Sequence, residues 1–283
     1  MRKLLLTGVA AVAMSAGGAH AAPVNTIWGD SATNGAPILQ EWDLNGNLLD
    51  TITAPNGENG RGVVQVGNIL YYTSATTNSI FAYNFATNTD LGTVFSIPGA
   101  TALSTIAYDG TNFWIGDYSG SNNVYHYSPT GTLLGTVALS NCTGFCDGLE
   151  FANGDLVENR GDANGPYDVY TTSGTLLKSA FITGQDTNST TGIAYDGTDY
   201  YISNIYNQTI SVYDGSGNFV RDITLQNGGY PTLVEDLSVN YSAVIPPIGT
   251  PEPSTWVMMI AGFAGMGYIA YRKRGAKTGL SAA

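Results

Sequence analysis

Residues 106–117 (IAYDGTNFWIGD) return further along the chain as residues 193–204 (IAYDGTDYYISN). Each copy has a short apolar stretch, an Asp-Gly pair and a second, aromatic-rich stretch, a pattern that predicts a β-hairpin. A second hairpin pattern follows each copy, because residues 124–134 (VYHYSPTGTLL) match residues 210–220 (ISVYDGSGNFV). Two hairpins in succession predict a repeated unit of four antiparallel strands.

The unit occurs five times along the chain. An aromatic residue marks the second hairpin of each copy, at spacings of 41, 44, 43 and 43 residues: Trp42, Tyr83, Tyr127, Tyr170 and Tyr213. A glycine four residues later supplies the hairpin turn in every copy except the second, where Thr87 stands: Gly46, Gly131, Gly174 and Gly217. Four strands in roughly 43 residues is the period of a β-propeller blade.

The two ends of this repeat array complement each other. Residues 26–30 (TIWGD) match the second strand of a unit, so the first copy lacks its innermost strand. Residues 235–239 (EDLSV) match an innermost strand that has no further strands behind it. Pairing the two would close the ring and remove its free edges. We therefore predict an all-β, five-bladed β-propeller over residues 22–244, closed by its N- and C-terminal strands. A six-bladed ring would need one more copy than the sequence contains.

The N-terminus has the pattern of a secretory signal peptide. Arg2 and Lys3 precede a largely apolar run over residues 4–16, and Ala19-His20-Ala21 forms an A-x-A cleavage site. A transmembrane anchor is the alternative, but an apolar run of this length is too short to span a bilayer. We predict a signal peptide over residues 1–21, cleaved after Ala21.

The C-terminus predicts a short membrane-spanning segment. Residues 245–254 form a proline-rich spacer, and the following 17 residues, 255–271, carry no charge, which is the lower limit for a spanning helix. A basic cluster behind them favours the cytoplasmic side: Arg272, Lys273 and Arg274. We predict a single hydrophobic helix with its basic cluster over residues 255–274 and a tail over residues 275–283. A plain single-span anchor is the simplest interpretation of this segment alone.

A proline-flanked glutamate stands just before the span, as Pro251-Glu252-Pro253, and Trp256 follows three residues later. The prolines keep this stretch extended and accessible to a protease. With the glycine-containing span and the basic cluster, residues 250–274 resemble the PEP-CTERM sorting signal of Gram-negative bacteria. The resemblance implies processing by an exosortase, a membrane transpeptidase-like cysteine protease, and export linked to exopolysaccharide or biofilm. We expect the protein to be held in the inner membrane transiently and then to reach the cell surface or the extracellular space.

The charge of the chain between these ends excludes one class of partner. Four basic residues face 21 acidic ones there, a net charge of −17: Arg61, Arg160, Lys178 and Arg221 are the basic ones. A nucleic-acid-binding protein needs a basic face for phosphates, so we expect no nucleic-acid partner. The acidic excess favours solubility and is compatible with divalent cations. Simple solvation of Asp-rich turns is the alternative explanation.

Cysteine and histidine offer little catalytic chemistry. Cys142 and Cys146 stand close together in an exported chain, which predicts a disulfide. A metal site would need further Cys or His ligands nearby, which the sequence lacks. His126 is the one histidine left after signal cleavage, and we expect it to have a structural role on a strand.

Polar residues recur at two positions of the repeat that would surround one mouth of the central channel. The ends of the second strands carry Asp30, Ser74, Asp117, Asn159 and Asn204, and the starts of the innermost strands carry Arg61, Ser104, Asp147, Thr191 and Glu235. The oxygen ligands among them form a candidate ligand or metal site, with Ca²⁺ as the candidate cation: Asp30, Asp117, Asp147, Asn159, Asn204 and Glu235. The alternative is that these side chains bind only their own turns.

Two functions follow from these features. We favour a non-catalytic surface or matrix protein, linked to exopolysaccharide or biofilm, that binds matrix polysaccharide or surface proteins, because Tyr, Trp, Asn and Asp suit sugar rings. The alternative is a metal-dependent hydrolase acting on a lactone or a glycan at the channel mouth. That alternative rests on an analogy with propeller lactonases at the level of the fold.

Overall fold

The structure is a computed structural model and describes residues 25–142, 146–161, 166–183, 190–228 and 233–244. The predicted signal peptide and the predicted sorting segment lie outside the described residues. Within the described part of the chain, no helix combines the length and the apolar character that crossing a membrane requires.

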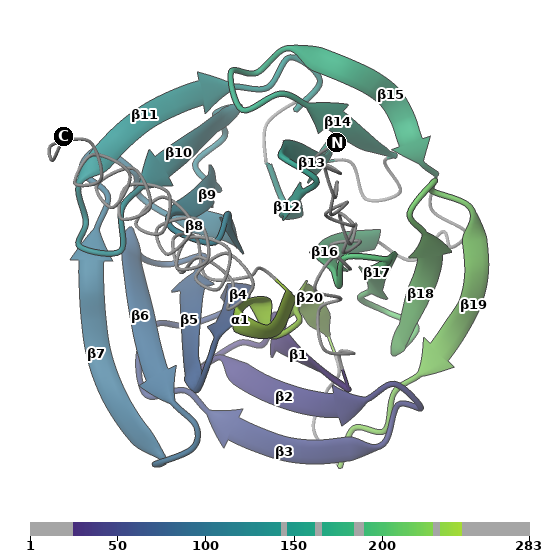
Figure 1. Ribbon diagram of the computed structural model, residues 1–283. Helices are drawn as coiled ribbons and strands as arrows, with labels where there is room; N and C mark the ends of the chain where they lie inside the picture. Colours follow the sequence, from purple (N-terminus) through teal and green to yellow (C-terminus); the bar gives the residue numbers. More distant parts are fainter. Residues whose placement is uncertain (1–24, 143–145, 162–165, 184–189, 229–232, 245–283) are drawn as a thin grey trace, which may run out of the picture.

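Five four-stranded antiparallel sheets stand around a common axis, which confirms the predicted all-β, five-bladed propeller (Figure 1). Blade 1 contains β20 (Val234–Ser238), β1 (Thr26–Ser31), β2 (Ile38–Asp43) and β3 (Leu48–Thr53). Blade 2 contains β4 (Gly60–Val66), β5 (Ile69–Ser74), β6 (Ser79–Asn84) and β7 (Thr89–Ser96). Blade 3 contains β8 (Leu103–Tyr108), β9 (Phe113–Asp117), β10 (Asn123–Tyr127) and β11 (Leu133–Ala138).

The remaining two blades follow the same order from the axis outward. Blade 4 contains β12 (Leu149–Ala152), β13 (Asp155–Asn159), β14 (Tyr167–Tyr170) and β15 (Leu176–Ile182). Blade 5 contains β16 (Thr190–Tyr195), β17 (Asp199–Asn204), β18 (Thr209–Asp214) and β19 (Phe219–Thr224). A single helical turn, α1 (Tyr241–Val244), comes after β20.

The ring closes through the two ends of the repeat array, as the sequence predicts. Strand β20 pairs antiparallel with β1, with Leu237 opposite Gly29 and Ser238 opposite Trp28. A second link joins blade 1 to blade 5, because the indole Nε1 of Trp42 donates a hydrogen bond of 2.7 Å to the carbonyl oxygen of Gln226. The ring is therefore closed near its axis by the pairing of β20 with β1 and near its rim by the hydrogen bond of Trp42.

Apolar clusters between neighbouring blades make the core. The five aromatic residues that mark the repeat are all buried, and Trp42 and Tyr170 are completely inaccessible. The outermost strands are largely exposed, as in β11, where Leu133 and Leu134 are both exposed. Burial therefore decreases from the innermost strand of a blade to the outermost one, as between β8 and β11.

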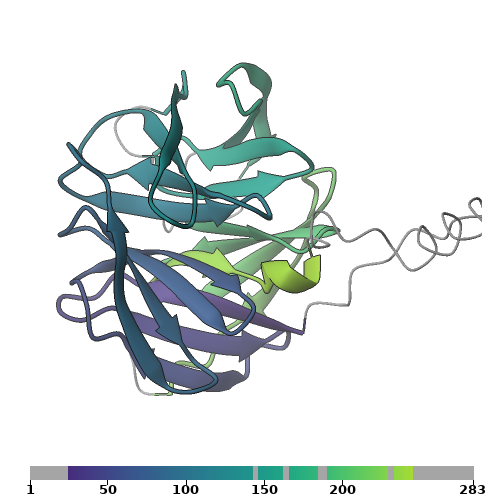
Figure 2. The same cartoon turned by 60° about the vertical axis from the view of Figure 1, so that its left-hand side comes forward.

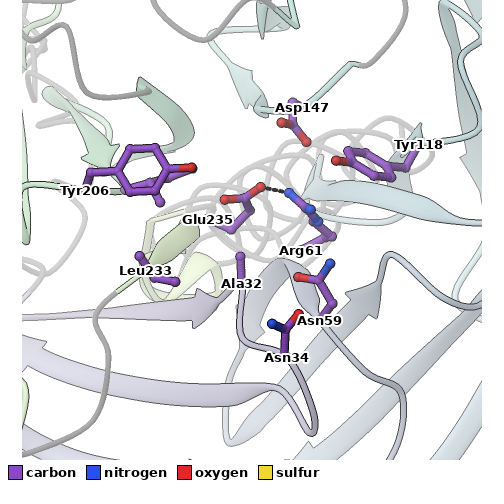
Figure 3. A pocket seen from close by; sticks show the side chains of 10 residues that line it. Ala32, Asn34, Asn59, Arg61, Tyr118, Asp147, Tyr206, Leu233 and Glu235 are labelled. Carbon is purple, nitrogen blue, oxygen red and sulfur yellow. Dashed lines mark ion pairs between the residues drawn. The ribbon is translucent and has the colours of Figure 1, made fainter.

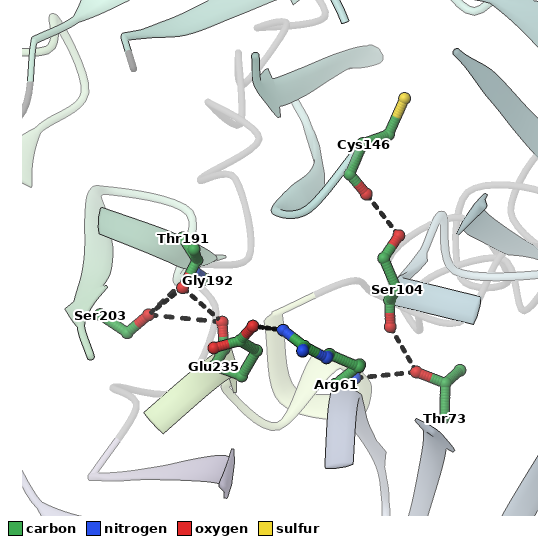
Figure 4. A network of polar contacts seen from close by, with 9 residues as sticks. Arg61, Thr73, Ser104, Cys146, Thr191, Gly192, Ser203 and Glu235 are labelled. Atoms are coloured by element: carbon green, nitrogen blue, oxygen red, sulfur yellow. Dashed lines mark hydrogen bonds and ion pairs between the residues drawn. The ribbon is translucent and has the colours of Figure 1, made fainter. Parts of the chain in front are cut away.

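Hydroxyl groups link the inner strands of neighbouring blades (Figure 4). The hydroxyl of Thr73 accepts from the Gly62 amide at 2.8 Å and donates to the carbonyl of Ser104 in the next blade. In blade 5, Ser203 likewise accepts from the Gly192 amide at 2.8 Å, and Thr191 donates to the Glu235 carbonyl at 2.9 Å. These links set the registers of the innermost strands against one another.

The two ends of the described chain leave from the same face of the ring. Strand β1 runs antiparallel to β20, so the start of β1 lies beside the end of β20. Helix α1 follows directly and lies over the middle of the ring on that face (Figures 1 and 2). The innermost strands begin on the opposite face, which therefore faces away from both ends.

Candidate functional site

A cavity of about 370 Å³ opens at the start of the innermost strands, and all five blades contribute to its lining. Arg61 of β4 and Glu235 of β20 face each other there, and Asp147, just before β12, lies across the mouth from both (Figure 3). These three residues occupy the same position in three copies of the repeat, which is why the ring brings them together. The lining is completed by Ala32, Asn34, Asn59, Tyr118, Ile205, Tyr206 and Leu233.

Arg61 is the cationic centre of the cavity. Its guanidinium forms an ion pair with Oε1 of Glu235, and the two side chains are only 12% and 3% exposed. The guanidinium also lies over the ring of Tyr118, 4.3 Å from the ring centroid, in cation–π geometry. A buried charge needs such a partner, because leaving one alone in a low-dielectric site is strongly unfavourable.

Two carboxylate oxygens of the lining have no hydrogen-bond partner among the described residues: Oε2 of Glu235 and Oδ1 of Asp147. Burial raises the pKa of Asp147, and the positive charge of Arg61 opposes part of that rise. Buried polar atoms in folded proteins are nearly always paired, so unpaired acceptors in a cavity point to a donor supplied from outside the chain.

Asp147 is held in place by two features of its own loop. Cys142 and Cys146 form a disulfide with their Cα atoms 5.6 Å apart, which confirms the predicted pairing. The carbonyl of Cys146 also accepts a hydrogen bond of 2.5 Å from the Ser104 hydroxyl of the preceding blade. The disulfide thus braces the residue that stands directly before Asp147, a role that the sequence does not reveal.

Three of the six predicted ligand residues bind groups of their own blade or of the next blade and are not among the lining residues. Asp117 accepts hydrogen bonds from the Ser119 amide at 2.7 Å and from the Tyr125 hydroxyl at 2.9 Å. Asn159 accepts from the Gly161 amide at 2.9 Å and donates to the Thr190 carbonyl at 2.8 Å. Asn204 donates to the hydroxyls of Thr209 and Ser211 at 3.0 and 2.9 Å.

Asp30, the fourth of these residues, is fully buried below the mouth, in contact with the backbone at Gly60. Burial and the neighbouring Asp236 raise its pKa well above the ordinary value. Only Asp147 and Glu235 of the predicted set line the cavity. Sequence reasoning aligned Arg61 with them but did not anticipate its ion pair, and it missed Tyr206, which lies outside the repeat pattern.

The residues at the mouth fit a divalent cation poorly. A Ca²⁺ ion takes six to eight oxygen ligands, whereas the carboxylate of Glu235 is already paired with a guanidinium. Among the described residues, three closely spaced potential ligands are Cys142, Cys146 and Glu158. The two sulfurs there belong to the disulfide and are not thiolates.

His126 lies on β10, away from the cavity lining. Its ring stacks on Trp114 with 3.9 Å between centroids, and its Nε2 is 3.2 Å from Oδ2 of Asp109. The same Asp109 oxygen accepts from Nε1 of Trp114 at 3.2 Å, while Oδ1 binds the amides of its own Asp-Gly turn. The imidazole therefore belongs to a packed aromatic pair at the hairpin turn.

Fold and site together define a five-bladed β-propeller with a charged cavity centred on the ring axis. Residues 250–274 match the model of the PEP-CTERM protein-sorting motif, so the chain carries this motif, as the resemblance in its sequence indicated. The motif implies an exported, cell-surface-directed protein that is processed by exosortase. No curated protein sequence is similar enough to this chain to give a match.

Two solved structures are similar to this chain. A chain in the crystal structure of a nidogen/laminin complex is 12% identical, with a TM-score of 0.53, and the alignment covers 77% of this chain and 98% of that one. Glutaminyl cyclase from Myxococcus xanthus is 13% identical, with a TM-score of 0.47, and the alignment covers 68% of this chain and 77% of that one. The first likeness shows the propeller fold and carries no information on the ligand.

Proposed function

We propose that this protein is a non-catalytic binding protein of the cell surface or the exopolysaccharide matrix, and that it holds a glycan in the cavity at the channel mouth. The observation that supports this proposal most is the makeup of the cavity, which combines an exposed aromatic ring with carboxylate oxygens that have no donor among the residues that the structure describes. Tyr206 is 68% exposed at the rim, and Asp147 and Glu235 supply the oxygens.

These groups suit the chemistry of a sugar. One face of a pyranose ring is lined by C–H groups and packs against an aromatic face such as that of Tyr206, while the hydroxyls at its edge donate to carboxylates. The amides of Asn34 and Asn59 offer both donors and acceptors in the same lining. A volume of about 370 Å³ lies within the range of roughly 300–1,000 Å³ typical of small-ligand sites.

The orientation of the ring supports a role outside the membrane. The cavity opens on the face away from α1 and from the start of β1, so the chain that leads to the sorting motif departs from the other face. A protein held by its C-terminal segment would therefore present the cavity to the surrounding medium before and after processing.

The hydrolase alternative has weaker support. A metal-dependent reaction at the mouth would place a cation among the acids there, where the Arg61 guanidinium already pairs with Glu235. The six residues that suggested such a site divide between the cavity, its floor and three separate turns. Binding without catalysis needs only the two of them that line the cavity, Asp147 and Glu235.

Titration calorimetry with hexose and hexosamine tetrasaccharides, using the full chain in mild detergent, tests the binding proposal. Tyr206→Ala should weaken binding about two- to tenfold because the stacking surface is lost. Phe219→Ala is the matched control: it removes an exposed aromatic ring from outer strand β19 and should leave affinity unchanged. Failure of every tetrasaccharide to bind would contradict the proposal, as would Ca²⁺-dependent cleavage of any of them.

A further inference from the structure

The charges of the cavity narrow the class of glycan. Among the described residues that line it, Arg61 is the one cation and faces two carboxylates, those of Glu235 and Asp147. The ion pair takes one oxygen of Glu235, and Asp147 has no ion pair of its own. With both acids ionised, the lining carries one net negative charge. An uncharged sugar would leave that charge without compensation.

The geometry points to a ligand with a protonated amine, and we propose that the cavity binds a glycan containing a sugar with a free amino group. This inference rests on the proposed glycan-binding function and names the substituent that the cavity recognises. An ammonium has three N–H donors and no acceptor. These donors match in kind the acceptors of the lining, which are the carboxylates of Asp147 and Glu235, each with one oxygen that has no partner among the described residues, and the amide oxygens of Asn34 and Asn59.

The surroundings of Glu235 distinguish this cavity from a simple cluster of surface acids. Glu235 is only 2% exposed, and yet one of its two carboxylate oxygens has no partner among the described residues. Figure 3 shows the other oxygen on Arg61, so that the carboxylate is oriented by the ion pair and is not free to turn toward solvent. Glu235 therefore keeps one buried acceptor that no described residue satisfies.

Other charged ligands fit less well. A divalent cation would lie against the guanidinium of Arg61, and an acidic sugar would be repelled by Asp147 and by the net charge of −17 on the exported part of the chain. The same negative field draws amine-bearing chains toward the mouth. A lysine side chain shares the ammonium but lacks a ring to stack on Tyr206, so a glycan uses more of the lining.

The test compares two tetrasaccharides that differ only at the amine: β-1,4-linked glucosamine and its N-acetylated counterpart. Titration calorimetry with the full chain in mild detergent, near neutral pH, should show the free-amine form binding about ten- to hundredfold more tightly, as expected for hydrogen bonds to charged groups. Asp147→Asn and Glu235→Gln should each reduce that preference, with little change for the N-acetylated form. Asp50→Asn removes a charge from exposed outer strand β3 and should leave the preference intact.

The outcomes separate this inference from the proposed function. Equal binding of both tetrasaccharides would overturn the amine inference and leave glycan binding standing. If neither tetrasaccharide bound, both the amine inference and the proposed glycan-binding function would be overturned. If a lysine amide bound as tightly as the free-amine tetrasaccharide, the ring would add nothing, and the glycan assignment would be wrong. Thermal melts of each variant show whether a lost preference reflects lost folding. The Tyr206→Ala variant, which changes a residue on the solvent-exposed rim, provides a second check.

Discussion

Buried carboxyl groups fill the middle of the ring. Asp236 of β20 accepts hydrogen bonds through Oδ2 from the Thr105 hydroxyl at 2.9 Å and the Val63 amide at 3.3 Å, so it reaches two other blades. Glu150 of β12 accepts from the Tyr195 amide at 3.2 Å and from the hydroxyl of Tyr241 in α1. These contacts tie the inner strands of different blades together around the axis.

Burial raises the pKa well above the ordinary value for four acids in the described chain: Asp30, Glu150, Glu158 and Asp236. An acid with a raised pKa binds its proton more tightly when folded. Its contribution to stability is therefore complete below the pKa in the unfolded chain, about 4, and is lost as pH rises through the folded value. Asp117 and Asp168, whose pKa values are lowered by hydrogen bonds, act in the opposite sense.

We predict that the free energy of unfolding falls as pH rises above about 5, because the four acids with strongly raised pKa values bind their protons more tightly in the folded chain. Asp117 and Asp168 are ionised in both states at these pH values and leave the slope unchanged. Urea unfolding at several pH values over that range measures this free energy. Asp236→Asn should make the dependence shallower, since Asp236 interacts with Asp30, Glu150, Tyr167 and Tyr241 across the axis. Asp50→Asn, on exposed β3, serves as the control. Stability that increases with pH would contradict this account.

At the scale of strands, the innermost strands approach each other closely at one level of the ring. Three copies of the repeat have glycine there, Gly62, Gly148 and Gly192, and the other two have Thr105 and Asp236. A Cβ on Gly192 would clash with the backbone at Asp236, and one on Gly148 would meet the Thr191 carbonyl. Glycine at these positions therefore lets neighbouring inner strands approach closely, and at the same level of the ring Thr105 donates a hydrogen bond to Asp236.

We predict that Gly192→Ala costs about 1–3 kcal/mol of stability, because the neighbouring strand would have to move. The melting temperature should fall by several degrees. Gly135→Ala in outer strand β11 is the matched control, since no atom lies within 4 Å of the position that its Cβ would take and its backbone suits any residue. It should change stability by less than about 0.5 kcal/mol. Equal losses in both variants would show that inner-strand spacing is not the cause.

At the scale of the whole molecule, the ring has two functionally distinct faces. One face carries the start of β1 and helix α1, which connect to the signal peptide and the sorting motif predicted from sequence. The other face carries the cavity with Arg61, Asp147 and Glu235. Because consecutive strands are antiparallel, every loop at the cavity lies on the same side, away from the two ends.

We predict that the mature protein begins near Ala22 and ends near Pro251-Glu252-Pro253. The proline-flanked glutamate stays extended outside the bilayer, where exosortase can reach it, and the basic cluster stays in the cytoplasm. Intact mass of protein recovered from the cell surface measures both ends. Replacing Pro251, Glu252 and Pro253 with alanine should retain a longer, membrane-bound form. Release of that variant as readily as the original would show that the motif does not direct processing.

The sequence by itself determined the class of fold, the number of blades and the way the ring closes. Local sequence patterns that repeat with a fixed period determine those features. Ring closure followed from matching the unpaired innermost strand around Leu237 with the incomplete copy around Trp28. The disulfide was predictable for the same reason, because Cys142 and Cys146 are neighbours along the chain.

Only the tertiary structure decided which polar residues share a site. Asp117, Asn159 and Asn204 occupy repeat positions as suitable as that of Asp147, and yet their side chains turn to nearby hydroxyls and amides. The pairing of Arg61 with Glu235 joins residues from opposite ends of the chain, and the contact of Thr105 with Asp236 crosses the ring. Such contacts depend on the distances that ring closure imposes and on side-chain orientation, neither of which a repeating pattern of residue types records.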